Sequence, residues 1–311
     1  MKRIILIVLS ILAGLSVYMV SIAQEAPLME LEGGAALEQD PGLFTINGSG
    51  ENPKGEQPQL DTDSMDKLLR VKEETVSSQP PVQKDEPSLK SINFWYKIEN
   101  GRAHTDARIE QLLAEYNGIF VGPPRKTVYL TFDLGYEAGF TPQILATLKK
   151  EKVKGAFFVT GDYVKRQAEL VKRISSEGHL IGNHTANHPD LSNLSLEEIA
   201  KELKSVDGQL ESLGLTRTTF FRPPGGVFNE MVLETAKEYG YRAVLWSFAY
   251  RDWLTEAQPE RDFAKKTILA GASPGAILLL HGVSRTNSEV LEEVIKELKQ
   301  KGYTFGSLED L

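Results

Sequence analysis

The sequence has 311 residues and contains no cysteine. This absence excludes disulfide bonds, thiolate metal sites and cysteine nucleophiles. Any bound metal ion must therefore be held by nitrogen and oxygen ligands. The absence is also compatible with a location outside the cytoplasm.

Positive charge and histidine are both scarce. Lysine and arginine number 35 against 43 aspartates and glutamates, which gives a net charge of -8. No run of basic residues is long enough to bind a polyanion, so we expect no nucleic acid partner. There are only five histidines, so two of them close together are informative.

A long apolar run occurs at the start of the chain. Lys2 and Arg3 precede the run Ile4–Ala23, a pattern typical of an export signal or a membrane anchor. The run is long enough to span a bilayer, yet Ala23 is a small residue suited to signal peptidase. Residues 1–23 are thus predicted to be a signal peptide or a membrane anchor. We expect an exported protein that is extracytoplasmic, in the cell wall or tethered to the membrane through residues 4–23.

Residues 24–90 are rich in Pro, Gly, Glu, Gln, Ser and Asp. Such a segment cannot bury enough apolar surface to offset its ordering entropy. We predict a disordered, flexible linker, in which Met65–Val71 is one short helical patch.

The folded domain is predicted to span residues 91–311, with an N-terminal extension to about residue 125. From Lys126 onward, apolar runs alternate with helical stretches such as Ser195–Leu213, which opens with a capping box. The strand signals are Val128–Phe132, Ala156–Val159, His179–Ile181, Thr219–Phe221, Ala243–Trp246, Ala276–Leu280 and Tyr303–Phe305. Apolar strands separated by helices indicate parallel pairing with both faces buried. We predict an α/β fold, a distorted parallel (β/α) barrel of about seven strands that the C-terminal strand closes.

Polar residues stand where these strands end. Asp133 follows the first strand, His184 and His188 the third and Arg222 the fourth, while Asp252 lies beyond the fifth and His281 ends the sixth. In parallel α/β folds the carboxyl ends of strands meet on one face, where the chemistry lies. The alternative is that polar residues simply mark where strands stop. That alternative accounts poorly for histidines and an aspartate that directly abut apolar runs, so we expect one metal-assisted site.

His184 and His188 are the candidate metal ligands. They lie four residues apart, and pairs of imidazoles are common ligands of divalent metals. Pro189 disfavours helical backbone at His188, so a turn is expected to present the two rings.

The chain from about residue 126 resembles the polysaccharide deacetylases, which form carbohydrate esterase family four and carry the NodB-homology domain. The motifs are Thr131-Phe132-Asp133-Leu134-Gly135, His184-Thr185-Ala186-Asn187-His188-Pro189, Arg222-Pro223-Pro224-Gly225-Gly226, Asp252-Trp253 and Leu279-Leu280-His281. The resemblance implies a barrel fold, a divalent metal held by His184 and His188, and hydrolysis of an acetamide. Zinc is the expected metal, with cobalt, manganese and magnesium as alternatives.

Within this family the chain resembles the PdaA-type muramic acid deacetylases of δ-lactam biosynthesis. The resemblance rests on Thr131–Glu137, His281–Asn287 and Lys301–Leu308. It implies a spore-cortex substrate, peptidoglycan whose N-acetylmuramic acid has lost its stem peptide. Two positions depart from the pattern: Leu134 replaces an aspartate that binds metal in the wider family, and Gly225 stands where PdaA-type proteins tend to carry arginine.

The resemblance also implies roles for four further residues. Asp133 would act as general base and His281 as general acid, with Arg222 holding Asp133 ionised and Asp252 holding His281 protonated. An ordinary buried ion pair is the alternative for Arg222 and for Asp252. Glu137 is a candidate to replace the missing metal ligand, although a contact with substrate or a role in loop structure is expected first.

Other functions stay open at this point. The substrate could be another acetylated glycan, such as N-acetylglucosamine in peptidoglycan, chitooligosaccharide or xylan. The chain could also be a non-catalytic glycan-binding wall protein that kept the fold. A serine esterase is the least favoured reading, because we expect no Gly-x-Ser-x-Gly elbow to be present. Apart from the glycan we expect no partner, and we expect a monomer.

Overall fold

The computed structural model describes residues 87–311. The predicted leader (1–23), the patch Met65–Val71 and the linker up to residue 86 lie outside the described residues. Packing contacts begin at Ser88, which exchanges hydrogen bonds with Glu230, close to the expected start of the domain. Within residues 87–311 no helix is both long and apolar enough to cross a membrane.

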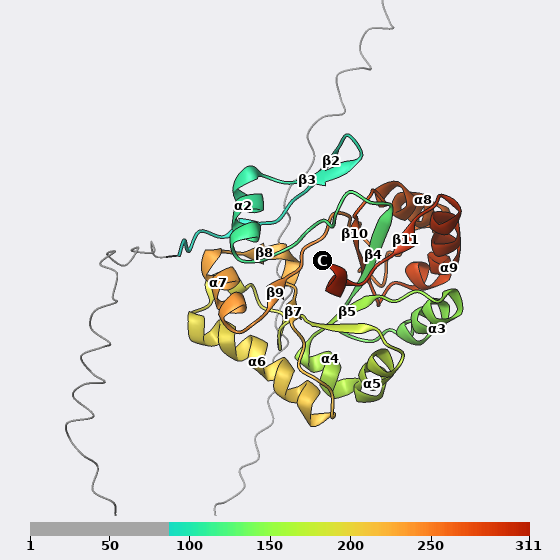
Figure 1. The fold of residues 1–311 in the computed structure, drawn as a ribbon. Coiled ribbons are helices and arrows are strands. Elements are labelled where there is room, and N and C mark those ends of the chain that lie inside the picture. The colour runs from blue at the N-terminus through green and yellow to red at the C-terminus, as the bar shows by residue number, and fades with distance from the viewer. Residues whose placement is uncertain (1–86) are drawn as a thin grey trace, which may run out of the picture. The chain divides into compact units, whose positions relative to one another are not determined.

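A parallel sheet forms the centre of the described fold (Figure 1). Its seven strands run in the order β10-β4-β5-β6-β7-β9, and β11 also pairs with β4. The strands are β4 (Thr127–Leu134), β5 (Ala156–Val159), β6 (Leu180–Asn183), β7 (Phe220–Phe221), β9 (Arg242–Ala243), β10 (Ile277–His281) and β11 (Thr304–Phe305). Strands β5 and β7 are buried along their whole length, as expected where both faces of a sheet are covered. The predicted parallel α/β fold of about seven strands is confirmed.

Helices cover the outside of this sheet (Figure 1). They are α3 (Thr141–Glu151), α4 (Gly161–Arg166), α5 (Ala168–Ser176), α6 (Leu196–Ser212), α7 (Glu230–Glu238), α8 (Arg261–Gly271) and α9 (Arg285–Gln300), with 3-10 turns η1 (Leu191–Asn193), η2 (Pro224–Gly226) and η3 (Leu308–Asp310). The predicted capping box opens α6, since Ser195 and Glu198 each accept a hydrogen bond from the backbone N–H of the other. Local sequence therefore sets where this helix begins.

The sheet curls into a distorted, incomplete barrel. The segment after β9 reaches β10 through a single bridge between Phe248 and Leu278 rather than through a ladder. The prediction that the C-terminal strand closes the barrel is wrong, because β11 pairs with Thr127 and Val128 at the start of β4. The reason is that β5 pairs with β4 only from Thr131 onward, which leaves the start of β4 with an open edge.

The apolar core lies on both sides of β4. Its outward residues Leu130, Phe132 and Leu134 pack with apolar residues of the covering helices in one large cluster. Tyr129 belongs instead to a smaller cluster with residues of β5, β7 and β10. Successive residues of a strand face opposite sides of a sheet, so β4 has an outer apolar face and an inner face that ends in Asp133.

The N-terminal extension packs beside the barrel. It consists of β1 (Ile92–Asn93), a hairpin of β2 (Lys97–Glu99) and β3 (Arg102–His104), and α2 (Ala107–Glu115). β1 pairs antiparallel with β8 (Val227–Phe228), which follows η2. α2 buries Ile109, Leu112 and Leu113.

Candidate active site

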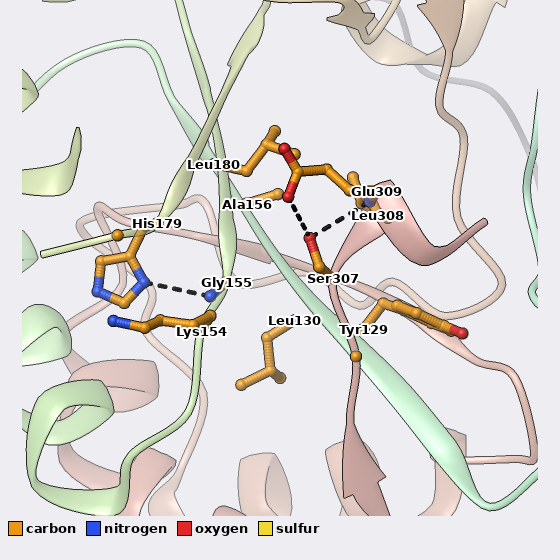
Figure 2. Close-up of a pocket in the computed structure, with 12 residues that line it drawn as sticks. Tyr129, Leu130, Lys154, Gly155, Ala156, His179, Leu180, Ser307, Leu308 and Glu309 are labelled. Carbon is orange, nitrogen blue, oxygen red and sulfur yellow. Dashed lines mark hydrogen bonds between the residues drawn. The ribbon is translucent and has the colours of Figure 1, made fainter.

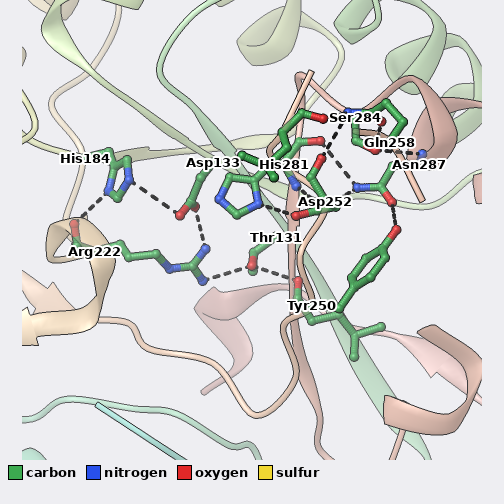
Figure 3. A network of polar contacts seen from close by, with 12 residues as sticks. Thr131, Asp133, His184, Arg222, Tyr250, Asp252, Gln258, His281, Ser284 and Asn287 are labelled. Atoms are coloured by element: carbon green, nitrogen blue, oxygen red, sulfur yellow. Dashed lines mark hydrogen bonds and ion pairs between the residues drawn. The ribbon is translucent and has the colours of Figure 1, made fainter. Parts of the chain in front are cut away.

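Asp133 and Arg222 form a buried ion pair at the carboxyl ends of β4 and β7. The Arg222 Nη1 atom lies 2.6 Å from Asp133 Oδ1, and the guanidinium also donates to the Thr131 hydroxyl (Figure 3). Arg222 Nε donates to the Val244 carbonyl. The arginine is fully buried, and its guanidinium carbon lies 4.1 Å from the centre of the Phe158 ring. Arg222 is therefore fixed in one position and fixes Asp133 in turn.

The charge of Asp133 is set by competing effects. Burial raises the pKa of its carboxyl, but the charge and hydrogen bond of Arg222, together with the nearby His184 and His281, outweigh burial, and the pKa lies below its usual range. Asp133 is thus ionised at neutral pH. Its second oxygen, Oδ2, stays 3.5 Å from His184 Nε2 and faces the histidine pair.

A tight turn after β6 presents His184 and His188, as predicted from Pro189. Two non-glycine residues of this turn have a positive φ, 66° at Thr185 and 58° at His188. Asn183 Oδ1 accepts from the Thr185 N–H, and the Thr185 hydroxyl accepts from the His188 N–H, which stabilises these conformations. Such strain is characteristic of functional sites. It brings the two imidazole rings to 4.8 Å between centroids.

Both imidazoles are neutral at pH 7. Burial lowers the pKa of His184 to about 4, and desolvation lowers the pKa of His188 as well, although His188 is the more exposed residue. His184 Nδ1 lies 2.9 Å from the Arg222 carbonyl oxygen, which can only accept, so Nδ1 carries the proton. The Nε2 lone pair of His184 is consequently directed toward Asp133.

His281 and Asp252 form a second pair at the end of β10. His281 Nδ1 donates to Asp252 Oδ1 at 2.7 Å, and the His281 backbone N–H donates to Oδ2. Burial lowers the pKa of His281, but the hydrogen bond and charge of Asp252 outweigh it, and the pKa is raised above its ordinary value of 6.5. His281 can therefore hold a proton near neutral pH.

Sequence reasoning missed the residues behind Asp252. Asn287, at the start of α9, donates to Asp252 Oδ2 and accepts from the Tyr250 hydroxyl (Figure 3). Asn287 shares the buried face of α9 with Leu291 and Val294. A polar residue at an apolar position of a helix is a signal that could have identified it.

The predicted site residues border one cavity of about 610 Å³. Its lining includes Asp133, His184, His188 and His281, and Asp252 and Arg222 support it from behind. Tyr136 and Trp253, each about half exposed, stand at its rim. The structure thus brings together all six residues that the sequence placed at strand ends, and the arrangement combines an ionised carboxylate, an imidazole whose pKa is raised and two neutral imidazoles.

Comparison with known proteins identifies the family. Residues 121–244 match the polysaccharide deacetylase family. Over 224 residues the chain is 45% identical to the peptidoglycan-N-acetylmuramic acid deacetylase PdaA of Bacillus subtilis, which covers 71% of this chain and 85% of PdaA. The chain belongs to the polysaccharide deacetylase family. The solved structure of PdaA, described as a family 4 carbohydrate esterase, matches with a TM-score of 0.70 and 43% identity over 72% of this chain and 97% of that structure.

A peptidoglycan-N-acetylglucosamine deacetylase of Bacillus cereus is more distant. It is 38% identical and covers 60% of this chain and 88% of its own length. The resemblance predicted from the five motifs is confirmed, and the chain is a hydrolase of acetamide bonds.

Deacetylases of this family are in general metal-dependent, and two residues of this site suit a divalent ion. His184 and His188 are neutral, and His184 is held by a carbonyl at Nδ1, as is usual for metal-binding histidines. Asp133 Oδ2 is the nearest carboxylate oxygen to His184 Nε2. Within residues 87–311 there is no group of three or more His, Asp or Glu side chains arranged to hold a metal, so this part of the chain offers fewer ligands than the usual three.

Neither Leu134 nor Glu137 supplies the missing ligand. Leu134 is fully buried in the outer apolar cluster, on the opposite face of β4 from Asp133. The Glu137 carboxylate accepts hydrogen bonds from the Tyr163 hydroxyl and from the backbone at the start of α3. Glu137 therefore has the role in loop structure that was expected first.

The expectation that no Gly-x-Ser-x-Gly pattern is present is wrong, because the pattern occurs once in the sequence, in Gly271-Ala272-Ser273-Pro274-Gly275. It lies between α8 and β10, so the serine follows a helix and precedes a strand, the reverse of a nucleophile elbow. Ser273 is buried, at the end of β10 opposite to His281. A serine esterase thus remains unsupported.

Proposed function

We propose that the protein removes the acetyl group from N-acetylmuramic acid of peptidoglycan whose stem peptide is already absent, in spore-cortex δ-lactam formation. The observation that carries the proposal is the pairing of Asp133 with Arg222 and of His281 with Asp252 around one cavity that also holds His184 and His188. The 45% identity to PdaA supports the choice of sugar.

Asp133 is the general base of this mechanism. Its Oδ1 is engaged by Arg222, whereas Oδ2 faces the cavity and accepts the proton of the attacking water. Arg222 keeps the carboxylate ionised and correctly oriented. An arginine held this rigidly loses no further freedom during the reaction.

His281 is the general acid. Its Nδ1–H is committed to Asp252, so Nε2 delivers the proton to the amine as the carbon–nitrogen bond breaks and acetate leaves. The raised pKa of His281 keeps the acid form available near neutral pH.

His184 and His188 would hold the metal. A divalent ion, zinc in the first instance with cobalt, manganese or magnesium as alternatives, would supply Lewis acidity toward the amide carbonyl and the water. Because Leu134 cannot coordinate, we expect this ion to bind weakly and to exchange readily.

The assignment implies a division of the chain. Residues 1–23 would direct export or anchor the chain, residues 24–90 would link it, and residues 91–311 would form the catalytic domain on the outer side of the membrane. A monomer suffices, because the described chain supplies all the side chains of the site.

Acetate release from three substrates tests the choice of sugar. We expect at least about tenfold faster release from peptidoglycan freed of its stem peptides than from intact peptidoglycan or N-acetylchitooligosaccharide. Equal or faster release from chitooligosaccharide would assign the enzyme to N-acetylglucosamine instead. That second candidate is favoured by the relative in B. cereus and by Gly225, where PdaA-type proteins tend to carry arginine.

One variant distinguishes the proposed enzyme from a non-catalytic glycan-binding wall protein. His281→Ala should retain binding to stem-free peptidoglycan yet release no acetate, because Nε2 of His281 is the proton donor. A wild-type protein that binds this glycan and releases no acetate at saturating zinc, cobalt or manganese would support the binding protein.

A further inference from the structure

The N-terminal extension contacts two backbone segments of the barrel that carry site residues. β1 pairs with β8, just after the loop that bears Arg222, and the Phe94 N–H donates to the Gly226 carbonyl at 2.9 Å. The Phe94 ring packs edge-on against Trp246, with 5.5 Å between centroids. Gly226 makes this approach possible: its φ is 68°, and a side-chain carbon there would lie 2.6 Å from Trp246.

Tyr96 makes the next contact along the extension. Its hydroxyl accepts from the Ala249 N–H at 3.0 Å and donates to the Ala249 carbonyl at 3.3 Å. One side-chain atom thus pairs with both backbone polar groups of a residue 153 positions away. Ala249 lies in the irregular segment between β9 and β10, outside any strand. The Tyr96 hydroxyl therefore satisfies the two backbone groups that a neighbouring strand would satisfy in a sheet.

The segment that Tyr96 holds leads directly to the general acid. Ala249 follows Phe248, which bridges to β10, and precedes Asp252 by three residues. Asp252 is almost fully buried and binds both the ring and the backbone N–H of His281. Asn287, at the start of α9, restrains the Asp252 carboxylate. Tyr96 restrains the backbone of the same segment three residues earlier, at Ala249.

We propose that Tyr96 is a positioning residue for the deacetylation reaction: its hydroxyl fixes the 249–252 backbone and thereby places Asp252 against His281. The proposal rests on the role given to His281 under the proposed function. Tyr96 does not line the cavity, so it acts without touching substrate.

Tyr96→Phe tests this role, because it removes one oxygen and keeps the ring. We expect kcat to fall about tenfold while KM stays within about twofold, since an acid that is misplaced affects the transition state and not the binding of substrate. Tyr303→Phe is the matched control. It alters another half-buried tyrosine, next to β11 at the amino end of the barrel, and should leave kcat and KM unchanged.

A double-mutant cycle shows whether Tyr96 acts through Asp252. In an Asp252→Asn background, Tyr96→Phe should change kcat by less than about twofold, because the interaction that it supports is already lost. Multiplication of the two single effects would overturn the proposal. Wild-type kcat in Tyr96→Phe would also overturn it, as would a Tyr96→Phe protein without a cooperative unfolding transition, since Tyr96 would then be a folding residue.

The role proposed for Tyr96 and the proposed choice of sugar can fail independently of each other. The cycle is measured on whichever acetylated glycan the wild-type protein hydrolyses, so a wrong choice of sugar leaves it intact. If the wild-type protein releases acetate from chitooligosaccharide at least as fast as from stem-free peptidoglycan, a fall in kcat for Tyr96→Phe on chitooligosaccharide would support the role of Tyr96 while muramic acid is rejected as the preferred substrate.

Discussion

Two buried histidines stand at the two ends of β6, and only one belongs to the site. Burial lowers the pKa of His184, after the strand, and of His179, before it, to about 4 in each case. Their hydrogen bonds differ. His184 Nδ1 donates to a carbonyl and leaves the Nε2 lone pair facing Asp133. His179 Nδ1 accepts from the Gly155 N–H (Figure 2), so its proton is on Nε2, which has no hydrogen-bond partner among residues 87–311.

The comparison shows that a perturbed pKa does not by itself mark a functional histidine. Both residues are buried, but only the carboxyl end of β6 adds a buried Asp133–Arg222 ion pair and a second imidazole. The cavity beside His179, about 280 Å³ in volume, is lined mainly by backbone, apolar side chains, Lys154 and Glu309. The functional histidine, His184, differs from His179 in the residues that surround it, and the position where the parallel strands end determines those residues.

The largest expected effect comes from Asp133→Asn. The amide keeps an acceptor for Arg222 but cannot take up a proton, so kcat should fall by about 10² to 10⁴. Acetate release at saturating substrate measures it, with His179→Gln as the control at the other end of β6. A similar loss in His179→Gln would break the comparison, since it would place both ends of the strand in the reaction.

Metal removal should come next. We expect EDTA to abolish acetate release, and excess zinc, cobalt or manganese to restore it. In His184→Ala the concentration of metal required should rise by about tenfold to a hundredfold, because one of the two proposed imidazole ligands is lost. His179→Ala should require the same concentration as the wild type. Unchanged activity after rigorous removal of metal would contradict the role given to His184 and His188.

A smaller effect is expected on the pH profile. The pKa of Asp133 is lowered from 3.8, so the base is active well below neutral pH; the pKa of His281 is raised from 6.5, so activity should decline only as pH rises above that value. Asp252→Asn removes the group that raises the pKa of His281 most, which leaves burial and Arg222 to lower this pKa against the weaker effect of Asp133. The alkaline limb of kcat/KM should therefore move to lower pH, and an unmoved limb would show that another group is the acid.

The sequence sufficed for the six residues around the cavity because the rule behind them is topological. Parallel strands place their carboxyl ends together, so Asp133 and His281 could be grouped although 148 positions separate them. The tight turn at His188 could be inferred from Pro189 in the same way. Such inferences need only the position where a strand ends and the identity of the residues just beyond it.

Other features depend on contacts that no local pattern encodes. The position of β11 depends on where β5 begins to pair with β4, and the bond from Tyr96 to Ala249 joins two irregular segments. In the sequence motif Leu134 occupies the position of a metal ligand, whereas in the fold it is a core residue packed close to Gly282. Side-chain partners across long sequence distances require the coordinates.

The smallest effect on activity, and the sharpest on stability, is expected from His179. A histidine whose folded pKa lies below its unfolded value contributes stability that is fully present above pH 6.5 and is lost as pH falls toward about 4, because the unfolded chain binds the proton more readily. At an order of 1–3 kcal/mol, the loss should appear in urea unfolding measured between pH 7 and pH 4. His179→Gln has no group to titrate and should show a weaker pH dependence with wild-type acetate release at pH 7. An equally steep dependence in His179→Gln would mean that other groups, His184 included, dominate acid unfolding.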